Sequence, residues 1–505
     1  MTTDWEIEQL RRKLAEFERN SQKTSWLVGQ IKRKICNSPG EILSRMKRSF
    51  GKRRRNAILK AQPIDFKNES KDFSSKKNLA HPGANIGLHG ARAFFMSDTM
   101  MELVERARAL EPEIGVLQEN IQQLSLPEGD SDYTKLCSVL KLIPATSYDA
   151  IVLVPAGRMG GADLVAAVLA RALSQAGRTL ILRTDDKDWD CPHWYPESVD
   201  IVDISEAFKS ILQKERALYV LLTKLAAPKI FNVNSRLAFQ TYLSFGRQLS
   251  RQYSLYAYYF CMDRTPEGYE TGYPVWYFHP LLRYLDAALI DTCYLANLMV
   301  ERYAIPEFAQ DKIKTVYTPS QVDVADPPMS HRNSELPVGS RPRILWGGRL
   351  DRQKRFDLAR EIAAAMPDVD FICWGKAVLD AENKALKLPS NMTLNAPFQK
   401  YSELPLDNCT GWLYTSEWDG LPTILIELGA FGVPIVASAV GGVPELIDDT
   451  TGWPVPEDAD VAAYVVALRE MISNPALRKV RSRALQARVA ERHSMDNYAT
   501  LINSL

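Results

Sequence analysis

Apolar and polar residues follow two different patterns along this chain from residue 148 onward. Short runs that are mostly apolar predict buried parallel strands, and longer stretches with apolar residues three and four positions apart predict helices. The predicted strands are 150–154, 179–182, 201–202, 229–233, 255–261, 287–292, 313–317, 343–346, 369–374, 411–414 and 434–437. The predicted helices are 162–176, 206–225, 237–250, one that runs through 298 and 303, one that begins at 356, 423–431, and 461–472, which a charged helix follows. This alternation predicts an α/β fold with parallel sheets.

The predicted elements form two Rossmann-like domains, 147–325 and 340–490, and a polar, Pro-rich stretch joins them. The chain before them has a different character. We expect an amphipathic and basic extension over 1–75 and a helical insert over 76–146, whose first helix is capped at Ser97 and Asp98. The insert carries no recognisable chemistry, and we expect it to pack against the next domain or against a second subunit.

The composition is that of an ordinary globular protein, with 505 residues, 46% apolar and 24% charged, which suits two or three domains. Seven cysteines are scattered without a CxxC pair. We therefore expect reduced thiols and neither a disulfide framework nor a zinc site. No stretch has the pattern of a signal peptide or the length of a membrane span, so we expect a cytoplasmic protein.

Basic and apolar residues are interleaved over residues 26–60, where Glu41 is the only acid among the basic clusters. This pattern suits a helix that lies on an anionic membrane surface, and equally a solvated basic arm. Nucleic-acid binding would need a recognised binding fold, which is lacking, so no nucleic acid is expected. Apolar residues at helical spacing over 7–17 also allow an oligomer contact through the N-terminal helices.

The richest chemistry lies between the predicted strand 411–414 and the predicted helix 423–431. Pro422 suits the first turn of that helix, so we expect free amides around Gly420 to Thr423, at a helix N-terminus on the carboxyl edge of a parallel sheet. Two carboxylates, Asp419 and Glu427, flank this corner, and each could hold a pair of vicinal hydroxyls. The alternatives are that Asp419 only caps the helix and that Glu427 is solvated, but the apolar neighbours of Glu427 leave little solvated helix face.

The sequence Asp-Gly-Leu-Pro-Thr-Ile-Leu-Ile-Glu (419–427) resembles the acid-x7-Glu motif of retaining GT-B glycosyltransferases of family 4. The resemblance implies that Asp419 faces the donor sugar, that the backbone of Gly420, Leu421 and Pro422 holds sugar and phosphate, and that Glu427 binds the ribose. The family usually has Glu where this chain has Asp419.

Two glycine-rich turns strengthen the resemblance. The pattern Gly-Arg-Leu-x-x-x-Lys at 348–354 is similar to the family loop whose Arg349 and Lys354 hold the donor diphosphate. Two fixed cations beside a helix start would neutralise the charge that grows on the leaving group. Gly160 and Gly161 resemble the glycine loop that approaches the donor phosphate, and the alternative is a simple tight turn.

Two further polar segments follow predicted strands. By the same resemblance, Asp263 and Arg264 after strand 255–261 are candidates to activate or position an acceptor hydroxyl, the alternative being a surface turn. The acidic stretch 185–190 has D-x-D spacings that could hold a metal, but it follows the second strand of a Rossmann-like unit. We interpret it as a solvated acidic loop and expect neither a metal nor another cofactor.

The resemblance covers residues 149–505 and implies a GT-B fold, two domains facing a cleft, with the final segment 491–505 crossing back onto the first. It implies transfer of a sugar, with retention of configuration, from a nucleoside-diphosphate donor to a saccharide or lipid-linked acceptor, in surface polysaccharide, O-antigen or capsule synthesis at the inner face of the cytoplasmic membrane. Two alternatives remain, a nucleotide-sugar epimerase of the same fold and a non-catalytic scaffold with a decayed site.

Overall fold

The computed structural model describes residues 98–110, 132–158, 160–322, 340–376 and 387–505. All of these belong to one unit, Ala80–Leu505. The predicted basic extension over 1–75, its membrane stretch 26–60, and most of the stretch that joins the two sheet domains lie outside the described residues. In the described part of the chain, no helix is both long enough and apolar enough to span a membrane.

The first sheet domain contains, within the described residues, a seven-stranded parallel sheet of strand order β3-β2-β1-β4-β5-β8-β9. Its strands are β1 (Ala150–Val154), β2 (Thr179–Arg183), β3 (Asp200–Asp203), β4 (Lys229–Asn232), β5 (Ser254–Tyr259), β8 (Ala287–Ile290) and β9 (Ile313–Thr315). Ile151 pairs with Leu180 of β2 and with Ile230 of β4. The strand order reverses between β1 and β4, which creates a crevice at the carboxyl edge where such sheets bind ligands.

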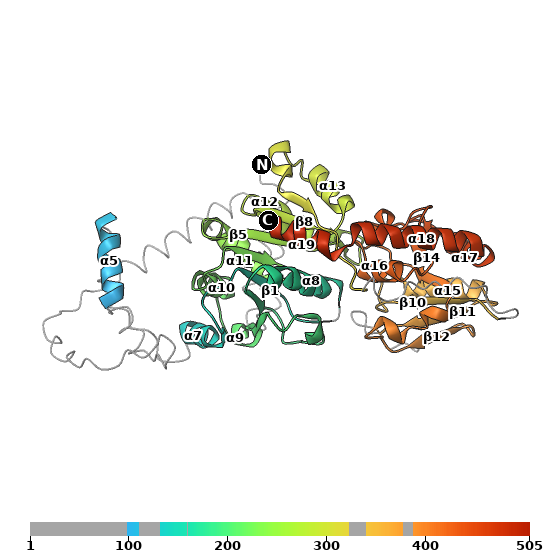
Figure 1. The fold of residues 1–505 in the computed structure, drawn as a ribbon, viewed down its shortest axis with the longest axis horizontal. Helices are drawn as coiled ribbons and strands as arrows, with labels where there is room; N and C mark the ends of the chain where they lie inside the picture. Colours follow the sequence, from blue (N-terminus) through green and yellow to red (C-terminus); the bar gives the residue numbers. More distant parts are fainter. Residues whose placement is uncertain (1–97, 111–131, 159, 323–339, 377–386) are drawn as a thin grey trace, which may run out of the picture. The chain divides into compact units, whose positions relative to one another are not determined.

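Helices cover both faces of this sheet (Figure 1). They are α7 (Asp132–Leu142), α8 (Gly161–Ala176), α9 (Ser205–Lys209), α10 (Lys214–Thr223), α11 (Arg236–Leu249), α12 (His279–Leu282), α13 (Cys293–Arg302) and α14 (Glu307–Gln310), with α5 (Asp98–Leu110) earlier in the chain. The single helix predicted over 206–225 is wrong. The chain breaks between α9 and α10, which places the Ile211 side chain in the core while Leu212 stays 92% exposed.

The second sheet domain has six parallel strands in the described residues, in the order β12-β11-β10-β13-β14-β15. They are β10 (Arg343–Gly347), β11 (Asp370–Trp374), β12 (Met392–Asn395), β13 (Gly411–Tyr414), β14 (Ile435–Ser438) and β15 (Trp453–Val455). The helices of this domain are α15 (Phe356–Ala365), α16 (Thr423–Ala430), α17 (Val461–Ser473) and α18 (Pro475–Arg492), and α19 (Met495–Ser504) ends the chain. The short helical turns of the two domains are η1 (Pro192–Trp194), η2 (Pro274–Phe278), η3 (Tyr401–Glu403), η4 (Leu406–Asn408) and η5 (Val443–Glu445).

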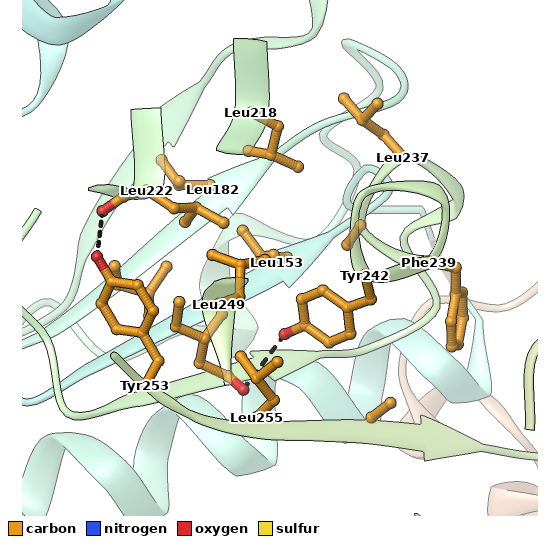
Figure 2. Packing of buried hydrophobic residues seen from close by; sticks show 14 of the residues in the cluster. Leu153, Leu182, Leu218, Leu222, Leu237, Phe239, Tyr242, Leu249, Tyr253 and Leu255 are labelled. Atoms are coloured by element: carbon orange, nitrogen blue, oxygen red, sulfur yellow. Dashed lines mark hydrogen bonds between the residues drawn. The ribbon is translucent and has the colours of Figure 1, made fainter. Parts of the chain in front are cut away.

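Both faces of each sheet are buried, which explains why the strands read as continuous apolar runs. On one face of the first sheet, Leu153 of β1 packs among side chains of α10 and α11 (Figure 2). Two tyrosines reach into this core without leaving their hydroxyls unpaired. The Tyr253 hydroxyl donates to the Leu222 carbonyl at 2.9 Å, and the Tyr242 hydroxyl donates to the Ile230 carbonyl at 3.4 Å.

The end of the chain packs on the first sheet domain, although α17 and α18 belong to the second. Helix α19 lies against α8 (Figure 1). The hydroxyls of Tyr498 and Tyr258 are hydrogen-bonded at 2.6 Å, and the Tyr256 hydroxyl donates to the Leu505 carbonyl at 2.5 Å. At the turn before α19, a ring nitrogen of His493 bonds the Thr318 carbonyl at 2.6 Å. These bonds join the last residues to β5 and to the segment after β9.

Candidate active site

A cavity of about 1540 Å³ lies between the two sheet domains. Its lining residues follow the carboxyl ends of strands in both sheets. From the first domain come Gly160, Gly161, Cys261, Asp263 and Asp291, and from the second come Arg349, Lys354, Asp419, Gly420, Leu421 and Pro422. The strand ends of two parallel sheets therefore face one space, where α/β proteins place their ligands.

Two helix N-termini meet at this cavity. Helix α8 begins at Gly161 and helix α16 begins at Thr423. A Cβ atom placed on Gly161 would lie 3.6 Å from Thr423 Oγ1, so the two ends are nearly in contact. The unpaired amides and the dipole of a helix start both favour an anion. The sequence placed Pro422 inside the first turn of α16, whereas it is the cap residue with extended backbone.

Lys354 and Asp419 form an ion pair in the cavity. Their side chains are 18% and 13% exposed, so solvent screens the pair only in part. The Tyr414 hydroxyl also donates to Asp419 Oδ2, and burial together with this carboxylate raises the pKa of Tyr414 well above its usual value. Asp419 is therefore held by a cation and a hydroxyl. The predicted diphosphate-binding Lys354 lies in the cavity, with its ammonium beside this carboxylate.

Hydrogen bonds from Thr415 hold the loop that carries Arg349 and Lys354. The Thr415 hydroxyl bonds the carbonyls of Lys354 at 2.8 Å and Arg355 at 3.2 Å, while Trp346 Nε1 donates to Thr415 Oγ1 at 3.0 Å. Arg355 has φ of +50°, a left-handed conformation that costs energy in a non-glycine residue. This turn directs Lys354 into the cavity. The Arg349 side chain is 42% exposed and bonds Gln353.

Asp291, directly after β8, is a site residue that sequence reasoning missed. It is 6% exposed, it lines the cavity, and its Oδ2 accepts the Leu421 amide at 3.4 Å from the other sheet domain. Burial, with Asp419 and Glu445 nearby, raises the pKa of Asp291 to about 7. The signal was an acid at the end of the apolar run 287–290, and it was overlooked because the predicted strand extended through Asp291.

Some of the loop amides that were predicted to be free already donate hydrogen bonds to carboxylates. The Gly420 amide donates to Asp419 Oδ1 at 3.0 Å, the Leu421 amide donates to Asp291, and Pro422 has no N–H. The expectation of unpaired amides over this whole stretch is therefore wrong. The carboxylates take these positions because the loop lies at the contact between the domains, which the sequence pattern does not reveal.

Glu427 is buried, as its apolar neighbours predicted, and is 1% exposed. However, it is not among the residues that line the cavity. Its carboxylate accepts bonds from the Ser320 hydroxyl at 2.8 Å and from the amides of Gln321 at 2.9 Å and Val322 at 3.2 Å. Desolvation raises the pKa of Glu427, and these bonds oppose the shift. The ribose contact stays a prediction, because the structure gives this carboxylate partners in the segment after β9.

The predicted loop after β5 is instead a hairpin, in which β6 (Asp263–Arg264) pairs with β7 (Glu270–Thr271). Asp263 lines the cavity, and burial raises its pKa, so this acid remains available for acceptor chemistry. Arg264 forms an ion pair at 3.0 Å with Glu457 of the second domain and does not line the cavity. The structure therefore brings only the first of the two candidates to the site.

The acidic stretch 185–190 is less solvated than predicted. Asp185 accepts the amides of Arg236 and Leu237 at the start of α11, and Arg158 pairs with Asp186 at 2.6 Å and Asp188 at 2.8 Å. Across the described ranges, no cluster of three or more His, Cys, Asp or Glu side chains is arranged to hold a metal ion.

Aromatic and polar side chains line the part of the cavity that belongs to the first domain. Tyr273 and the 43% exposed Trp276 come from the segment around η2, a π-helical turn of a kind often found at functional sites. Arg236 lines the same region, beside Asn234, whose φ of +65° is left-handed. Strained backbone and exposed aromatic rings next to a cavity are typical of ligand sites.

Residues 330–488 match the sequence model of the family Glycosyl transferases group 1. This range contains Arg349, Lys354, Asp419 and Glu427, the residues on which the resemblance rested. The chain carries a group 1 glycosyltransferase domain.

Two curated relatives match parts of this chain. An uncharacterized 41.2 kDa protein in the cps region of Klebsiella pneumoniae is 27% identical over 165 residues, which are 31% of this chain and 45% of that protein. The putative colanic acid biosynthesis glycosyltransferase WcaL of Escherichia coli K12 is 37% identical over 70 residues, 14% of this chain and 17% of that protein. The chain thus spans less than half of the length of each relative.

The crystal structure of Anabaena Alr3699/HepE in complex with UDP-glucose superposes with a TM-score of 0.55 at 15% identity and covers 70% of this chain and 98% of that one. At this identity the likeness shows the fold alone. Two parallel-sheet α/β domains with glycosyltransferase structural neighbours make this a GT-B fold, as predicted.

Proposed function

We propose that this protein transfers a sugar from a nucleoside-diphosphate donor to a hydroxyl of a saccharide or lipid-linked acceptor, with retention of anomeric configuration. The observation that carries the proposal is the meeting of two helix N-termini, at Gly161 and Thr423, in a cavity that also contains Lys354 and Arg349. Amides and fixed cations together suit a diphosphate, the most strongly charged part of such a donor.

The chemistry follows from this placement. The bond between the sugar's anomeric carbon and the diphosphate oxygen breaks while the acceptor oxygen bonds that carbon, and the acceptor proton passes to the departing diphosphate. Arg349 and Lys354 stabilise the negative charge that grows on the leaving group. This electrostatic stabilisation is strongest in a cavity that excludes water, and it would let the enzyme work without a metal ion. Retention is supported by the family resemblance of the 419–427 motif.

Lys354 must exchange partners in this scheme, because its ammonium now pairs with Asp419. A bound diphosphate would compete for Lys354 and leave Asp419 able to accept a hydroxyl of the donor sugar, the role that the resemblance gives to this position. The Tyr414 hydroxyl, which also bonds Asp419, would keep the carboxylate oriented during the exchange.

The acceptor belongs on the first-domain side of the cavity. Trp276 and Tyr273 offer aromatic faces, whose negative charge attracts the C–H bonds of a sugar ring. Asp263 lies in the same region and is our candidate to orient the attacking hydroxyl. The Escherichia coli relative carries the name of a putative colanic acid glycosyltransferase, and the Klebsiella pneumoniae relative is encoded in a cps region. They support a role in surface polysaccharide synthesis.

The test is binding followed by turnover. Calorimetry with UDP, GDP, UDP-glucose, UDP-galactose and GDP-mannose should find one nucleotide that binds tightly, and Lys354→Ala should weaken it at least tenfold (about 1.4 kcal/mol). NMR of the reaction with a mixed glycoside acceptor panel should show a new glycosidic bond with the donor's anomeric configuration. Activity should survive chelation by EDTA.

The two rival functions predict different results. An epimerase would consume the sugar nucleotide without any acceptor and release an isomeric sugar. A scaffold would bind none of the five compounds, and that result would overturn the proposal. Inversion of configuration in the product would leave the transferase assignment and refute retention.

A further inference from the structure

Asp291 has an unusual environment for a carboxylate. Its Oδ2 has one long bond, 3.4 Å from the Leu421 amide, and its Oδ1 is buried without a hydrogen-bond partner among the described residues. A buried acceptor without a partner costs roughly 1–3 kcal/mol, more when charged. Such a group in a folded protein calls for an explanation, and a ligand is the most direct one when the residue lines a cavity.

The neighbours of Asp291 indicate what kind of ligand group would suit it. A Cβ on Gly420 would lie 2.7 Å from Asp291 Oδ2, so the carboxylate directly contacts the loop that Asp419 begins. Burial raises the pKa of Asp291, and the nearby carboxylates of Asp419 and Glu445 add to this shift. A second anion, such as a phosphate, would be repelled here. A hydroxyl group would donate a hydrogen bond to the carboxylate and add no charge.

We propose that Asp291 recognises a hydroxyl of the transferred sugar, so that this sugar is held between one carboxylate from each sheet domain, Asp291 and Asp419. Two carboxylates that bind different hydroxyls of one ring fix its orientation better than one. Because the two carboxylates belong to different domains, the sugar also joins the domains across the cavity. Asp291 makes no contact with the nucleotide part of the donor, so it does not contribute to the affinity for the bare nucleoside diphosphate. This inference rests on the proposed function and adds a specificity-determining residue to it.

The experiment compares a nucleotide sugar with its bare nucleoside diphosphate. The sugar nucleotide that the wild-type protein binds best among UDP-glucose, UDP-galactose and GDP-mannose is titrated by calorimetry, alongside UDP or GDP. In Asp291→Ala, the affinity for the sugar nucleotide should fall at least tenfold while that for the bare diphosphate changes less than twofold. Asp291→Asn keeps an acceptor oxygen and should restore most of the discrimination.

Asp286 supplies a matched control at the other end of β8. Its carboxylate also accepts one backbone amide, that of Leu255 at 2.9 Å, but it does not line the cavity. Asp286→Ala should therefore leave the ratio of the two affinities unchanged, whatever it does to the melting temperature.

The outcomes separate the two proposals. If the wild-type protein binds none of the sugar nucleotides, the proposed function fails and this inference fails with it. If it binds one, and Asp291→Ala weakens the sugar nucleotide and the bare diphosphate equally or weakens neither, only the role of Asp291 is overturned. Equal weakening would show that Asp291 acts by holding the Leu421 loop.

Discussion

Replacing Glu427 by alanine separates two roles for this buried carboxylate. The family resemblance implies a ribose contact, whereas the structure shows bonds to the Ser320 hydroxyl and to the amides of Gln321 and Val322. We expect Glu427→Ala to lower stability and to leave nucleotide affinity within twofold of wild type. The reason is that the carboxylate holds the segment after β9 and does not line the cavity.

The size of the stability loss follows from the lost bonds. Hydrogen bonds to a charged group contribute about 1.5–3 kcal/mol each, and a buried amide left without a partner costs about 1–3 kcal/mol. Glu427 also carries a desolvation cost, seen in its raised pKa, which its removal relieves. We therefore expect a net loss of about 3 kcal/mol. For a unit of domain size this corresponds to a melting temperature lower by roughly 5–10 °C.

The assay combines differential scanning calorimetry with UDP and GDP titrations made well below the lowest melting temperature. Glu427→Gln is the matched variant, because glutamine has nearly the same side-chain volume as glutamate. Its NH2 group is a donor, so it cannot accept a hydrogen bond from a backbone amide in place of the lost carboxylate oxygen. It should lose stability as well, though less than the alanine variant. Titrating at low temperature prevents unfolding from being mistaken for weak binding.

One result would refute this reasoning. An unchanged melting temperature with nucleotide affinity weakened tenfold or more would assign Glu427 to the ribose, as the resemblance implies. It would also mean that Ser320, Gln321 and Val322 release the carboxylate when a nucleotide binds.

Three further predictions test other parts of the molecule. Lys354→Ala should weaken the preferred nucleoside diphosphate 10- to 100-fold in calorimetry, since one charge-assisted contact contributes about 1.5–3 kcal/mol. Trp276→Ala should raise the acceptor KM about tenfold with the donor KM unchanged, whereas Phe308→Ala, an 86% exposed aromatic in α14, should change neither. Burial lowers the pKa of His493 from 6.5 to about 4. The contribution of His493 to stability is therefore fully present above pH 6.5 and falls between pH 6.5 and 4, where only the unfolded chain gains the proton, by up to about 3 kcal/mol. His493→Gln should flatten this decline in melting temperature.

Each of these has a clear contrary result. Unchanged nucleotide affinity in Lys354→Ala would remove the diphosphate from that loop. Equal increases in both KM values for Trp276→Ala would indicate a general loss of cavity shape. Parallel pH profiles for His493→Gln and wild type, measured from pH 7.5 to 4.5, would assign the acid sensitivity to other groups.

The sequence alone determined the fold class and the two strand-turn-helix corners of the second domain. The apolar runs 344–346 and 411–414 are buried on both sheet faces, so their pattern is strong and local. Helix α16 ends within one residue of the predicted bound, and Gly432, with φ of +72°, follows it. The motif residues Arg349, Lys354 and Asp419 lie in one cavity, because parallel strands bring their carboxyl ends to one edge.

Tertiary structure decided which partner each site residue has. Asp291 meets Leu421 across 130 positions of sequence, and Glu427 meets Gln321 across 106, and no local periodicity encodes such contacts. The hairpin at Asp263 and Arg264 likewise depends on a partner, since Arg264 pairs with Glu457 of the other domain. Side-chain spacing fixes which elements form and which of their ends carry polar groups. Only the docking of two sheets determines whether a carboxylate there faces a ligand, a backbone amide or another charge.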